Sequence, residues 1–380
     1  MLLLTATTLM AASGIHYQTP MLGAMGAEFG VGGAAIGWIP TLTFGGFLCG
    51  IVFLVPLGDK LDKRRLIITL HALAVVALLA AAGASGLRTA AAAGFVIGLC
   101  SCFAQVIVPL VAELAPAEAR GRSVGTLLSA LFLGILFARI TGGIVAAHLG
   151  WRAMYLIGGG LLALLGPALI ARLPHTAPKT QLRYPELLAS MIALVRAHPE
   201  MRRVIAIQLC LGMCYGGFWA TIATMLLHTH GLGPQVAGLI GIPGAAGVLI
   251  ARAAGRQLDL RGAGPVVVTG VSVIVLSYIV FAFGIWWPIA LAIGAALLDC
   301  GLRATMVANQ TLVNSLAPDA RARSNTIFGF AVWTGNAAGA FVASSALAAS
   351  GWLAVCAISI VAACSALAVQ LFAKFTALRR

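Results

Sequence analysis

The chain has 380 residues, of which 61% are hydrophobic and 9% are charged, whereas about 25% of residues are charged in soluble domains. This composition, with a mean hydropathy of +1.02, excludes a soluble enzyme, a disordered chain and a fibrous repeat. In a soluble protein, a net charge of +14 would suggest nucleic-acid binding. In a membrane protein it can instead report the orientation in the membrane, and the positions of the cations decide between the two interpretations.

Twelve apolar stretches are long enough to cross a membrane, which takes about 20 residues of helix. In chain order they are 2–25, 35–57, 66–84, 89–114, 123–149, 151–172, 204–227, 236–254, 265–283, 288–316, 324–349 and 352–373. A spanning segment must satisfy its own backbone hydrogen bonds, and these stretches are too long for barrel strands. We therefore expect an all-α polytopic membrane protein with twelve transmembrane helices.

The cations mark one side of the predicted membrane protein. Twenty of the 24 Lys and Arg residues lie in every second loop or in the last few residues, and only Arg88 and Arg152 lie in the opposite loops. Basic loops face the cytoplasm. Both termini are therefore predicted to be cytoplasmic, and the net charge is explained by orientation without nucleic acid.

The two halves of the chain repeat three short motifs in the same order, between 197 and 202 residues apart. Residues 58–64 recur at 255–261, 115–123 at 317–324, and 150–151 at 351–352. The repeat predicts two pseudo-symmetric six-helix bundles, residues 1–172 and 204–380, joined by a central cytoplasmic linker at 173–203. Two parallel repeats with a site between them suit transport by alternating access.

The loop after the second predicted helix carries Gly58 and Asp62, followed by the cations Lys63, Arg64 and Arg65. This pattern is similar to the signature Gly-x-x-x-Asp-Arg-x-Gly-Arg-Arg of the major facilitator superfamily, with an arginine in place of the second glycine. The chain resembles that superfamily over its full length. The resemblance implies a fold of two six-helix bundles and a function in membrane transport.

The signature implies a cytoplasmic latch between the two halves. In such a latch the glycine permits close helix approach, and the aspartate accepts hydrogen bonds from a helix amino terminus in the other half. The alternative is that these charges only mark the cytoplasmic side. The predicted latch residues are Gly58, Asp62, Arg65, Glu113, Gly255 and Asp259.

The fifth predicted helix resembles the antiporter signature Gly-x8-Gly-x3-Gly-Pro-x2-Gly-Gly. Gly125, Gly134, Gly142 and Gly143 lie at its spacings, but Ala-Arg replaces the central Gly-Pro. Glycines at this spacing imply efflux by an antiporter, although tight helix packing explains them equally well.

Two further stretches, 14–20 and 28–30, look like those of bacterial members of the twelve-span drug:proton antiporter branch. This resemblance implies a multi-pass protein of the bacterial inner (cytoplasmic) membrane.

Ionisable residues inside predicted helices are functional candidates, because charge inside a bilayer is costly. Arg139 lies about 24 Å along its helix from the cytoplasmic end, and Asp299 about 17 Å from the outer end. Arg303 follows Asp299 by one turn, on the same face. Asp299 is either half of a neutralising ion pair or the proton-coupling carboxylate. His16 is a second proton candidate, because imidazole titrates near neutral pH.

The resemblance implies a central cavity lined by predicted helices 1, 4, 7 and 10, with help from 2, 5, 8 and 11. The predicted substrate-binding residues are Tyr17, Gln18, Gln105, Arg139, Tyr215, Trp219, Arg303, Asn309, Trp333 and Asn336. Polar groups buried in lipid must find partners, so we expect some of these side chains only to tie helices together.

The sequence lacks hydrolase, metalloprotease and nucleotide-binding motifs, so we expect no enzyme, no ATP-driven transport, no cofactor and no metal. The main hypothesis is a proton-coupled exporter of a small organic molecule. The alternatives are an importer or facilitator of a polar or anionic metabolite without proton coupling, and a membrane receptor that has lost transport. The expected partners are the lipid bilayer, a small-molecule substrate and protons, and we expect a monomer.

Overall fold

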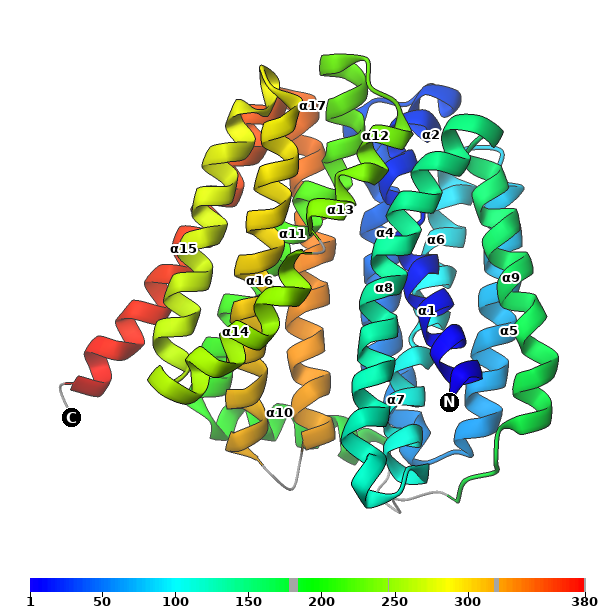
Figure 1. Ribbon diagram of the computed structural model, residues 1–380, viewed down its shortest axis with the longest axis vertical. Coiled ribbons are helices and arrows are strands. Elements are labelled where there is room, and N and C mark those ends of the chain that lie inside the picture. Colours follow the sequence, from blue (N-terminus) through cyan, green and yellow to red (C-terminus); the bar gives the residue numbers. More distant parts are fainter. Residues whose placement is uncertain (178–183, 245, 318–320, 379–380) are drawn as a thin grey trace. The chain divides into compact units, whose positions relative to one another are not determined.

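The computed structural model describes residues 1–177, 184–244, 246–317 and 321–378, which form helices joined by turns (Figure 1). Only the backbone is described at 117, 118, 120, 187, 246–249, 251–253, 259, 321, 322 and 373–378. No β-strand occurs in the described ranges, and nine stretches within them are long and apolar enough to cross a membrane. The all-α membrane fold is confirmed, whereas the count of twelve crossings stays a prediction.

The chain divides into two compact units. Unit 1 consists of Met1–Val31, Trp38–Tyr184 and Gly233–Leu239. Its helices are α1 (Leu2–His16), η1 (Thr19–Met21), α2 (Leu22–Phe29), α4 (Trp38–Cys49), η2 (Gly50–Leu54), η3 (Val55–Asp59), α5 (Lys63–Ala82), α6 (Leu87–Ser101), α7 (Phe103–Leu114), α8 (Ala117–Leu149), α9 (Trp151–Arg172) and α12 (Pro234–Leu239).

Unit 2 consists of Gly32–Gly37, Pro185–Leu232 and Ile240–Arg380. Its helices are α3 (Gly33–Ile36), α10 (Tyr184–Ala197, whose first residue belongs to unit 1), α11 (Pro199–His230), α13 (Gly241–Gly244), α14 (Ala246–Arg261), α15 (Ala263–Ala282), η4 (Phe283–Ile285), α16 (Pro288–Leu316) and α17 (Arg321–Leu378). This division into units does not test the boundaries predicted for the two bundles and the linker, which stay a prediction.

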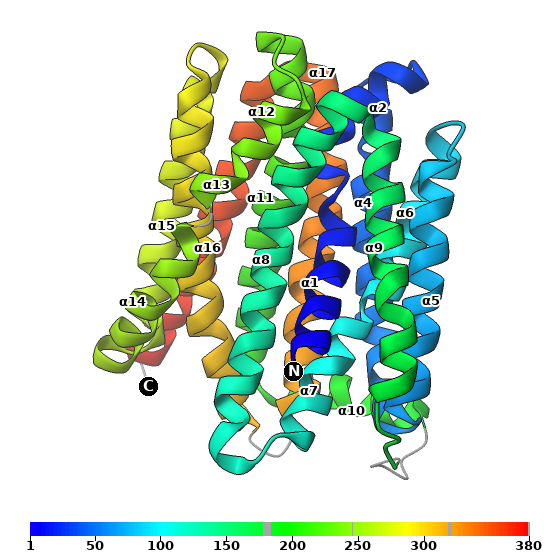
Figure 2. The ribbon, with the colours of Figure 1, turned by 45° about the vertical axis from the view of Figure 1, so that its right-hand side comes forward.

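The same helix pairs recur in both units. In unit 1, α1 packs against α8, α4 against α6, and α5 against α9 (Figure 2). In unit 2, α11 packs against α17, α14 against α16, and α15 against α17. In the predicted numbering of each half, these pairs join helices 1 and 5, 2 and 4, and 3 and 6. The two bundles are therefore pseudo-symmetric, as the repeated motifs predicted.

The repeated Gly-Trp motif forms the same sharp turn in each unit. Gly150 separates α8 from α9 at φ 82° and ψ 155°, and Gly351 divides α17 into two helices at φ 78° and ψ −170°. This region of backbone space is essentially restricted to glycine. The tryptophans that follow, Trp151 and Trp352, are both buried. The motif thus reverses the chain and anchors the next helix by its first side chain.

Proline breaks the first predicted helix. The sequence predicted one helix over 2–25, but α1 ends at His16 and a 3₁₀ turn containing Pro20 precedes α2. Proline has no backbone N–H and clashes with the carbonyl of the preceding turn. The break lies beside the predicted site residues at positions 16–18, so it decides where their side chains point.

Each unit includes a short segment from the other half of the sequence. Residues 32–37 pack in unit 2 and residues 233–239 pack in unit 1. A Cβ added to Gly37 would overlap a serine of α17, and one added to Gly238 would overlap the carbonyl O of Arg139 in α8. The segments begin 201 positions apart, which is the spacing of the repeat, so the two close crossings are equivalent.

We expect Gly150→Ala and Gly351→Ala each to destabilise the protein by about 1–3 kcal/mol, because an L side chain is strained at these backbone angles. Neither glycine has an atom within 4 Å of an added Cβ, so the cost is one of conformation alone. Gly160→Ala, in the middle of α9 and equally open, is the matched control. It should be neutral or stabilising by up to about 1 kcal/mol. Unfolding midpoints of the purified variants in detergent measure this difference, and equal effects at the three positions would contradict the account.

Candidate functional site

A buried carboxylate and a guanidinium lie one turn apart in α16. Asp299 is 3% exposed, and Arg303 Nη2 lies 3.9 Å from Asp299 Oδ1. A buried charge is strongly unfavourable unless it is paired. The pair therefore neutralises two charges inside unit 2, and its separation is at the long end of ion-pair distances.

Asp299 lies beneath a glycine of α13. A Cβ added to Gly244 would lie 2.6 Å from Asp299 Oδ2 and 3.9 Å from Trp219 Cζ2. Gly244 of α13 therefore lies close to both the Asp299 carboxylate of α16 and the indole ring of Trp219 of α11, a predicted substrate-binding residue. The sequence analysis missed Gly244, whose only signal was its position directly after Pro243.

The aromatic side chains of α11 separate into two groups. Phe218 stacks on Phe281 of α15, with ring centroids 4.1 Å apart, and belongs to the core of unit 2. Tyr215 and Trp219 meet edge to face at 6.3 Å. These two predicted substrate-binding residues therefore lie together on α11.

The core of unit 2 also contains buried amides. Asn309 of α16 and Asn336 of α17 are 2% and 3% exposed, and Gln208 of α11 is fully buried. Among the described residues, neither amide atom of Gln208 has a hydrogen-bond partner. A buried polar group without a partner costs about 1–3 kcal/mol, so it calls for water or a ligand. Gln208 was missed by the sequence reading, although it is a lone amide seven residues before Tyr215.

A buried hydrophobic cluster shows where Gln208 lies. The cluster contains Met201 and Val204 of α11, Val313 of α16, and Ile327 and Phe328 of α17. Residues four apart share a helix face, so Gln208 and Asn309 each lie one turn beyond this cluster on α11 and α16. Trp333, also on α17, is partly exposed.

In unit 1 the residues at the break in the first helix point to different neighbours. His16 is buried, its Nδ1 lies 2.9 Å from the carbonyl O of Ala12, and its ring faces Phe44 of α4. Gln18 Oε1 accepts a hydrogen bond from Thr43 of α4 at 3.0 Å. Both side chains therefore tie the first helix to α4.

Tyr17 lies on another side of the same helix and is fully buried. A Cβ added to Gly158 of α9 would lie 2.5 Å from its ring, and Tyr155 of α9 meets it edge to face at 6.5 Å. The structure thus places Tyr17 in the core of unit 1, against a helix that is not among the predicted cavity-lining helices.

Two other predicted binding residues in unit 1 differ in burial. Arg139 of α8 is 3% exposed, while Gln105, on α7 just after the break between α6 and α7, is partly exposed. The structure brings Arg139 close to the Gly238 crossing of α12.

Three of the four glycines predicted on the fifth helix make close approaches in unit 1. A Cβ at Gly134 would overlap the carbonyl O of Leu9 in α1, one at Gly142 would lie 3.1 Å from Tyr17 O, and one at Gly143 would lie 2.5 Å from Pro234 O. Gly125 has nothing within 4 Å of an added Cβ. The motif therefore lets α8 touch both the first helix and α12.

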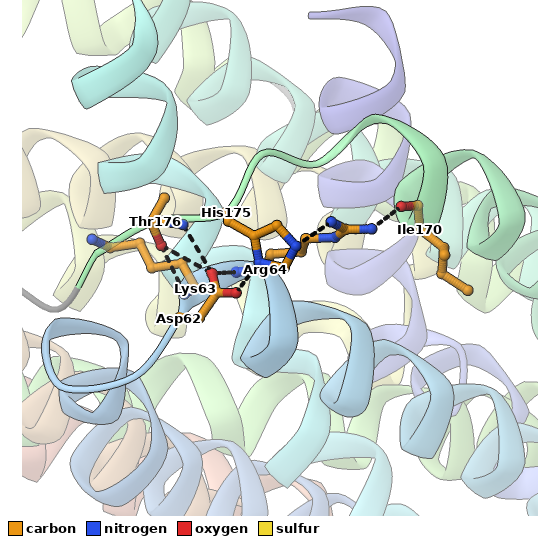
Figure 3. Close-up of polar contacts among 6 residues, drawn as sticks. All are labelled: Asp62, Lys63, Arg64, Ile170, His175 and Thr176. Carbon is orange, nitrogen blue, oxygen red and sulfur yellow. Dashed lines mark hydrogen bonds and ion pairs between the residues drawn. The ribbon is translucent and has the colours of Figure 1, made fainter.

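The signature loop lies at the start of α5, where it meets the segment after α9 (Figure 3). Asp62 is the N-cap of α5 and accepts a hydrogen bond from the Arg64 N–H at 3.1 Å. It also accepts from the Thr176 N–H at 3.0 Å, and its Oδ2 lies 2.6 Å from His175 Nδ1. The sequence reading missed His175 and Thr176, which lie more than 110 residues away in the chain.

A second ion pair lies beside this loop. Lys63 of α5 is buried, and its Nζ lies 3.2 Å from Glu113 of α7. Gly58 allows the preceding turn to approach α7, since a Cβ there would lie 3.2 Å from Val106. Arg65 is exposed. These contacts lie inside unit 1, and the latch between the halves stays a prediction.

The second copy of the loop has a different local structure. Gly255 and Asp259 lie within the continuous helix α14, and the chain turns after it at Gly262. Gly255 has no atom within 4 Å of an added Cβ. The side chain of Asp259 lies outside the described part of the chain. The repeat therefore conserves the position of the loop but not its turn.

Hydrogen bonds stabilise the ionised form of Asp62. Burial alone would raise its pKa, but the hydrogen bonds from the Thr176 N–H, His175 and the Arg64 N–H outweigh burial and lower the pKa from 3.8 to about 2. Such bonds favour a carboxylate over its neutral form. The loop is therefore held by a charge that persists throughout the physiological pH range.

A carboxylate also joins three elements at the far ends of the helices of unit 1. Glu28 of α2 accepts a hydrogen bond from Trp151 Nε1 at 2.5 Å and another from Arg152 Nη1. Arg152 also donates to the carbonyl O of Ala84 at 2.8 Å. Hydrogen bonds from Arg152 and Trp151 lower the pKa of Glu28. The repeat lacks this acid, and Trp352 donates instead to the carbonyl O of Phe281 at 2.7 Å.

The all-helical fold, the long apolar helices and the few buried charges define a polytopic membrane transport protein. The profile of the Major Facilitator Superfamily matches residues 2–287 of the chain. The chain belongs to the Major Facilitator Superfamily.

Its relatives are transporters. The chain is 33% identical over 356 residues to the uncharacterized transporter YgaY of Escherichia coli O157:H7, covering 93% of this chain and 90% of that protein. It is 34% identical over 362 residues to the probable transporter SCO4007 of Streptomyces coelicolor, covering 94% and 83%. Its fold is similar to the crystal structure of the nucleoside transporter NupG, with a TM-score of 0.80 at 15% identity over 100% and 99% of the two chains. The superfamily is confirmed, and the antiporter branch stays a prediction.

We expect Gly134→Ala to destabilise unit 1 by about 1–3 kcal/mol, because the added methyl group forces α1 and α8 apart. Gly125→Ala is the matched control in the same helix, and it should be neutral or slightly stabilising. Thermal unfolding of the two purified variants measures the difference. Unfolding temperatures that fall equally would show that the close approach at Gly134 does not carry the packing.

We expect Asp62→Asn to lower the stability of the protein by roughly 1 kcal/mol at neutral pH, after allowance for solvent screening. Because the pKa of Asp62 is lowered on folding, its contribution is complete above the unfolded value of 3.8 and is lost as the pH falls towards about 2. Asparagine keeps the helix cap, so the variant loses only the charge. The unfolding midpoints of wild type and variant, measured from pH 7 to pH 2.5, should therefore converge as the pH falls. Asp59→Asn serves as the control. A difference that stays constant with pH would contradict this account.

Proposed function

We propose that the chain is a secondary active transporter that exports a small organic molecule in exchange for protons, with Asp299 as the proton-binding group. The observation that supports this proposal is the buried Asp299–Arg303 pair at 3.9 Å. Each partner of a buried ion pair depends on the other for its stability, so any change in the state of Asp299 alters the surroundings of Arg303. Membership of the superfamily supports transport itself.

Exchange requires that the proton and the substrate exclude each other at Asp299. When Asp299 is ionised, it can accept hydrogen bonds from a donor or cationic group of the substrate, beside the indole ring of Trp219. When Asp299 is protonated, this attraction is lost and the substrate leaves. The proposal therefore favours a polar organic substrate that presents a hydrogen-bond donor, held partly by stacking on Tyr215 and Trp219.

We propose that the basic end of the helices faces the cytoplasm of a bacterial cell, with both termini on that side of the inner membrane. The transporter is proposed to act as a monomer in the lipid bilayer. Proton exchange would then draw on the inward proton gradient. His16 is the second proton candidate, and its Nδ1 lies 2.9 Å from the carbonyl O of Ala12.

A second candidate function is facilitated movement of a polar or anionic metabolite without proton coupling. The specific observation in its favour is that the guanidinium group of Arg139 is buried and that of Arg303 is only 13% exposed, and guanidinium binds carboxylate and phosphate well. In this case flux would follow the substrate gradient and would not respond to an imposed pH gradient. A receptor without transport would bind ligand but show no flux.

The experiment begins with a thermal-shift screen of polar organic compounds against the purified protein. Any stabilising compound is then tested for flux into proteoliposomes with and without a pH gradient. Proton-coupled export predicts that a pH gradient drives the compound against its own concentration gradient. Flux that only equilibrates the compound would favour the facilitator.

We expect Asp299→Asn to abolish gradient-driven flux while the ligand still binds. In wild type, the affinity for the ligand should fall about tenfold for each unit by which the pH is lowered, once Asp299 begins to take up a proton. The reason is that one proton competes with the ligand. In the variant, affinity should no longer depend on pH. Glu200→Gln, an exposed carboxylate at the start of α11, is the control for loss of one negative charge. Full gradient-driven flux in Asp299→Asn would contradict the proposed role.

A further inference from the structure

A histidine bridges the acid and the base of the signature loop in unit 1. His175 Nδ1 lies 2.6 Å from Asp62 Oδ2, and its Nε2 lies 2.6 Å from Arg64 Nη1. Figure 3 shows the imidazole between the start of α5 and the chain that follows α9. The signature loop itself contains no histidine. The fold brings His175 to it from a distant part of the chain, 113 positions after Asp62.

The two contacts fix the position of the proton on the ring. A guanidinium group can only donate hydrogen bonds, so Nε2 of His175 must accept from Arg64. The proton therefore resides on Nδ1, which donates to the carboxylate of Asp62. The arrangement requires the neutral imidazole in its Nδ1–H form.

Other hydrogen bonds complete the junction. The Lys63 N–H donates to Thr176 Oγ1 at 2.9 Å, and Thr176 Oγ1 lies 3.3 Å from Asp62 Oδ1. Arg64 Nη2 donates to the carbonyl O of Ile170, near the end of α9, at 2.5 Å. We call Asp62, Arg64, His175 and Thr176 the clasp, because they fasten the segment after α9 to the first turn of α5.

The charged groups around His175 act in opposite directions. Asp62 favours the protonated ring and Arg64 favours the neutral ring. The neighbouring cation Lys63 is directed to Glu113 of α7, and the other charges nearest in the chain, Arg65 on α5 and Arg172 on α9, are exposed. The side chain of His175 is itself 66% exposed, so protons reach it directly from water.

We propose that His175 is a positioning residue whose protonation opens one side of the clasp. Neutral His175 holds Arg64 through Nε2 and Asp62 through Nδ1. Protonation turns Nε2 into a donor that faces another donor of like charge, so the contact with Arg64 breaks while the contact with Asp62 remains. The clasp therefore responds to acidification on the basic side of the protein.

This inference does not depend on Asp299 or on the direction of transport. It concerns only how the signature loop is held within unit 1. Its failure would therefore leave the proposed proton coupling untouched, and the reverse also holds.

The test is nuclear magnetic resonance of the full-length protein labelled with ¹⁵N at histidine, in detergent, across pH 5 to 8.5. The chain has seven histidines, and the resonances of His175 are those lost in His175→Gln. At high pH they should report a proton on Nδ1. Arg64→Ala should raise the titration midpoint of His175 and Asp62→Asn should lower it, each by a few tenths to about one pH unit.

Controls separate this role from a general loss of structure. Arg64→Lys keeps a cationic donor, so its midpoint should stay closer to that of wild type than the midpoint of Arg64→Ala. Asparagine at position 62 still caps α5, so that variant retains its fold. His198, at the start of α11 in unit 2, should titrate identically in every variant. A proton on Nε2 at high pH, or midpoints of His175 that move in the same direction in Arg64→Ala and Asp62→Asn, would overturn the proposal.

Discussion

The structure depends on the cost of placing charge in an apolar interior. Only 9% of the residues are charged, and two of the charges that the fold buries lie beside an opposite charge: Lys63 pairs with Glu113 at 3.2 Å, and Asp299 lies 3.9 Å from Arg303. Removing one partner of such a pair leaves an uncompensated charge, which costs about 3–5 kcal/mol. The same constraint makes the Asp299–Arg303 pair the most informative feature for function. If Asp299 takes up a proton, Arg303 loses the negative charge that stabilises it and needs another partner.

Much of the fold could be predicted from the sequence, because a membrane helix is a local feature. An apolar stretch of sufficient length has no other way to satisfy its backbone in lipid, and the repeated motifs predicted two similar bundles that the helix pairs of both units confirm. Local irregularities were less accessible. Pro20 carried a readable signal for the break after His16, whereas nothing in residues 255–261 indicated that the second signature loop lies inside a continuous helix.

The candidate site was harder to predict, because a resemblance identifies a helix but not the face of the helix. Consecutive residues in a helix point about 100° apart, so Tyr17 packs against α9 while Gln18 bonds to α4. Partners that are distant in the chain could not be inferred either. His175 reaches Asp62 across 113 positions, and Gln208 became noticeable only once its burial without a hydrogen-bond partner was seen.

The proposed proton coupling requires Asp299 to alternate between a carboxylate paired with Arg303 and a protonated acid. Infrared difference spectroscopy of the reconstituted protein tests this most directly, because a protonated carboxyl group has a carbonyl band of its own. The account predicts a band that appears on acidification, weakens when a transported ligand is added, and is absent from Asp299→Asn. A spectrum without any carboxyl band sensitive to that substitution would mean that Asp299 stays ionised as a structural partner of Arg303, and proton coupling at this residue would be wrong.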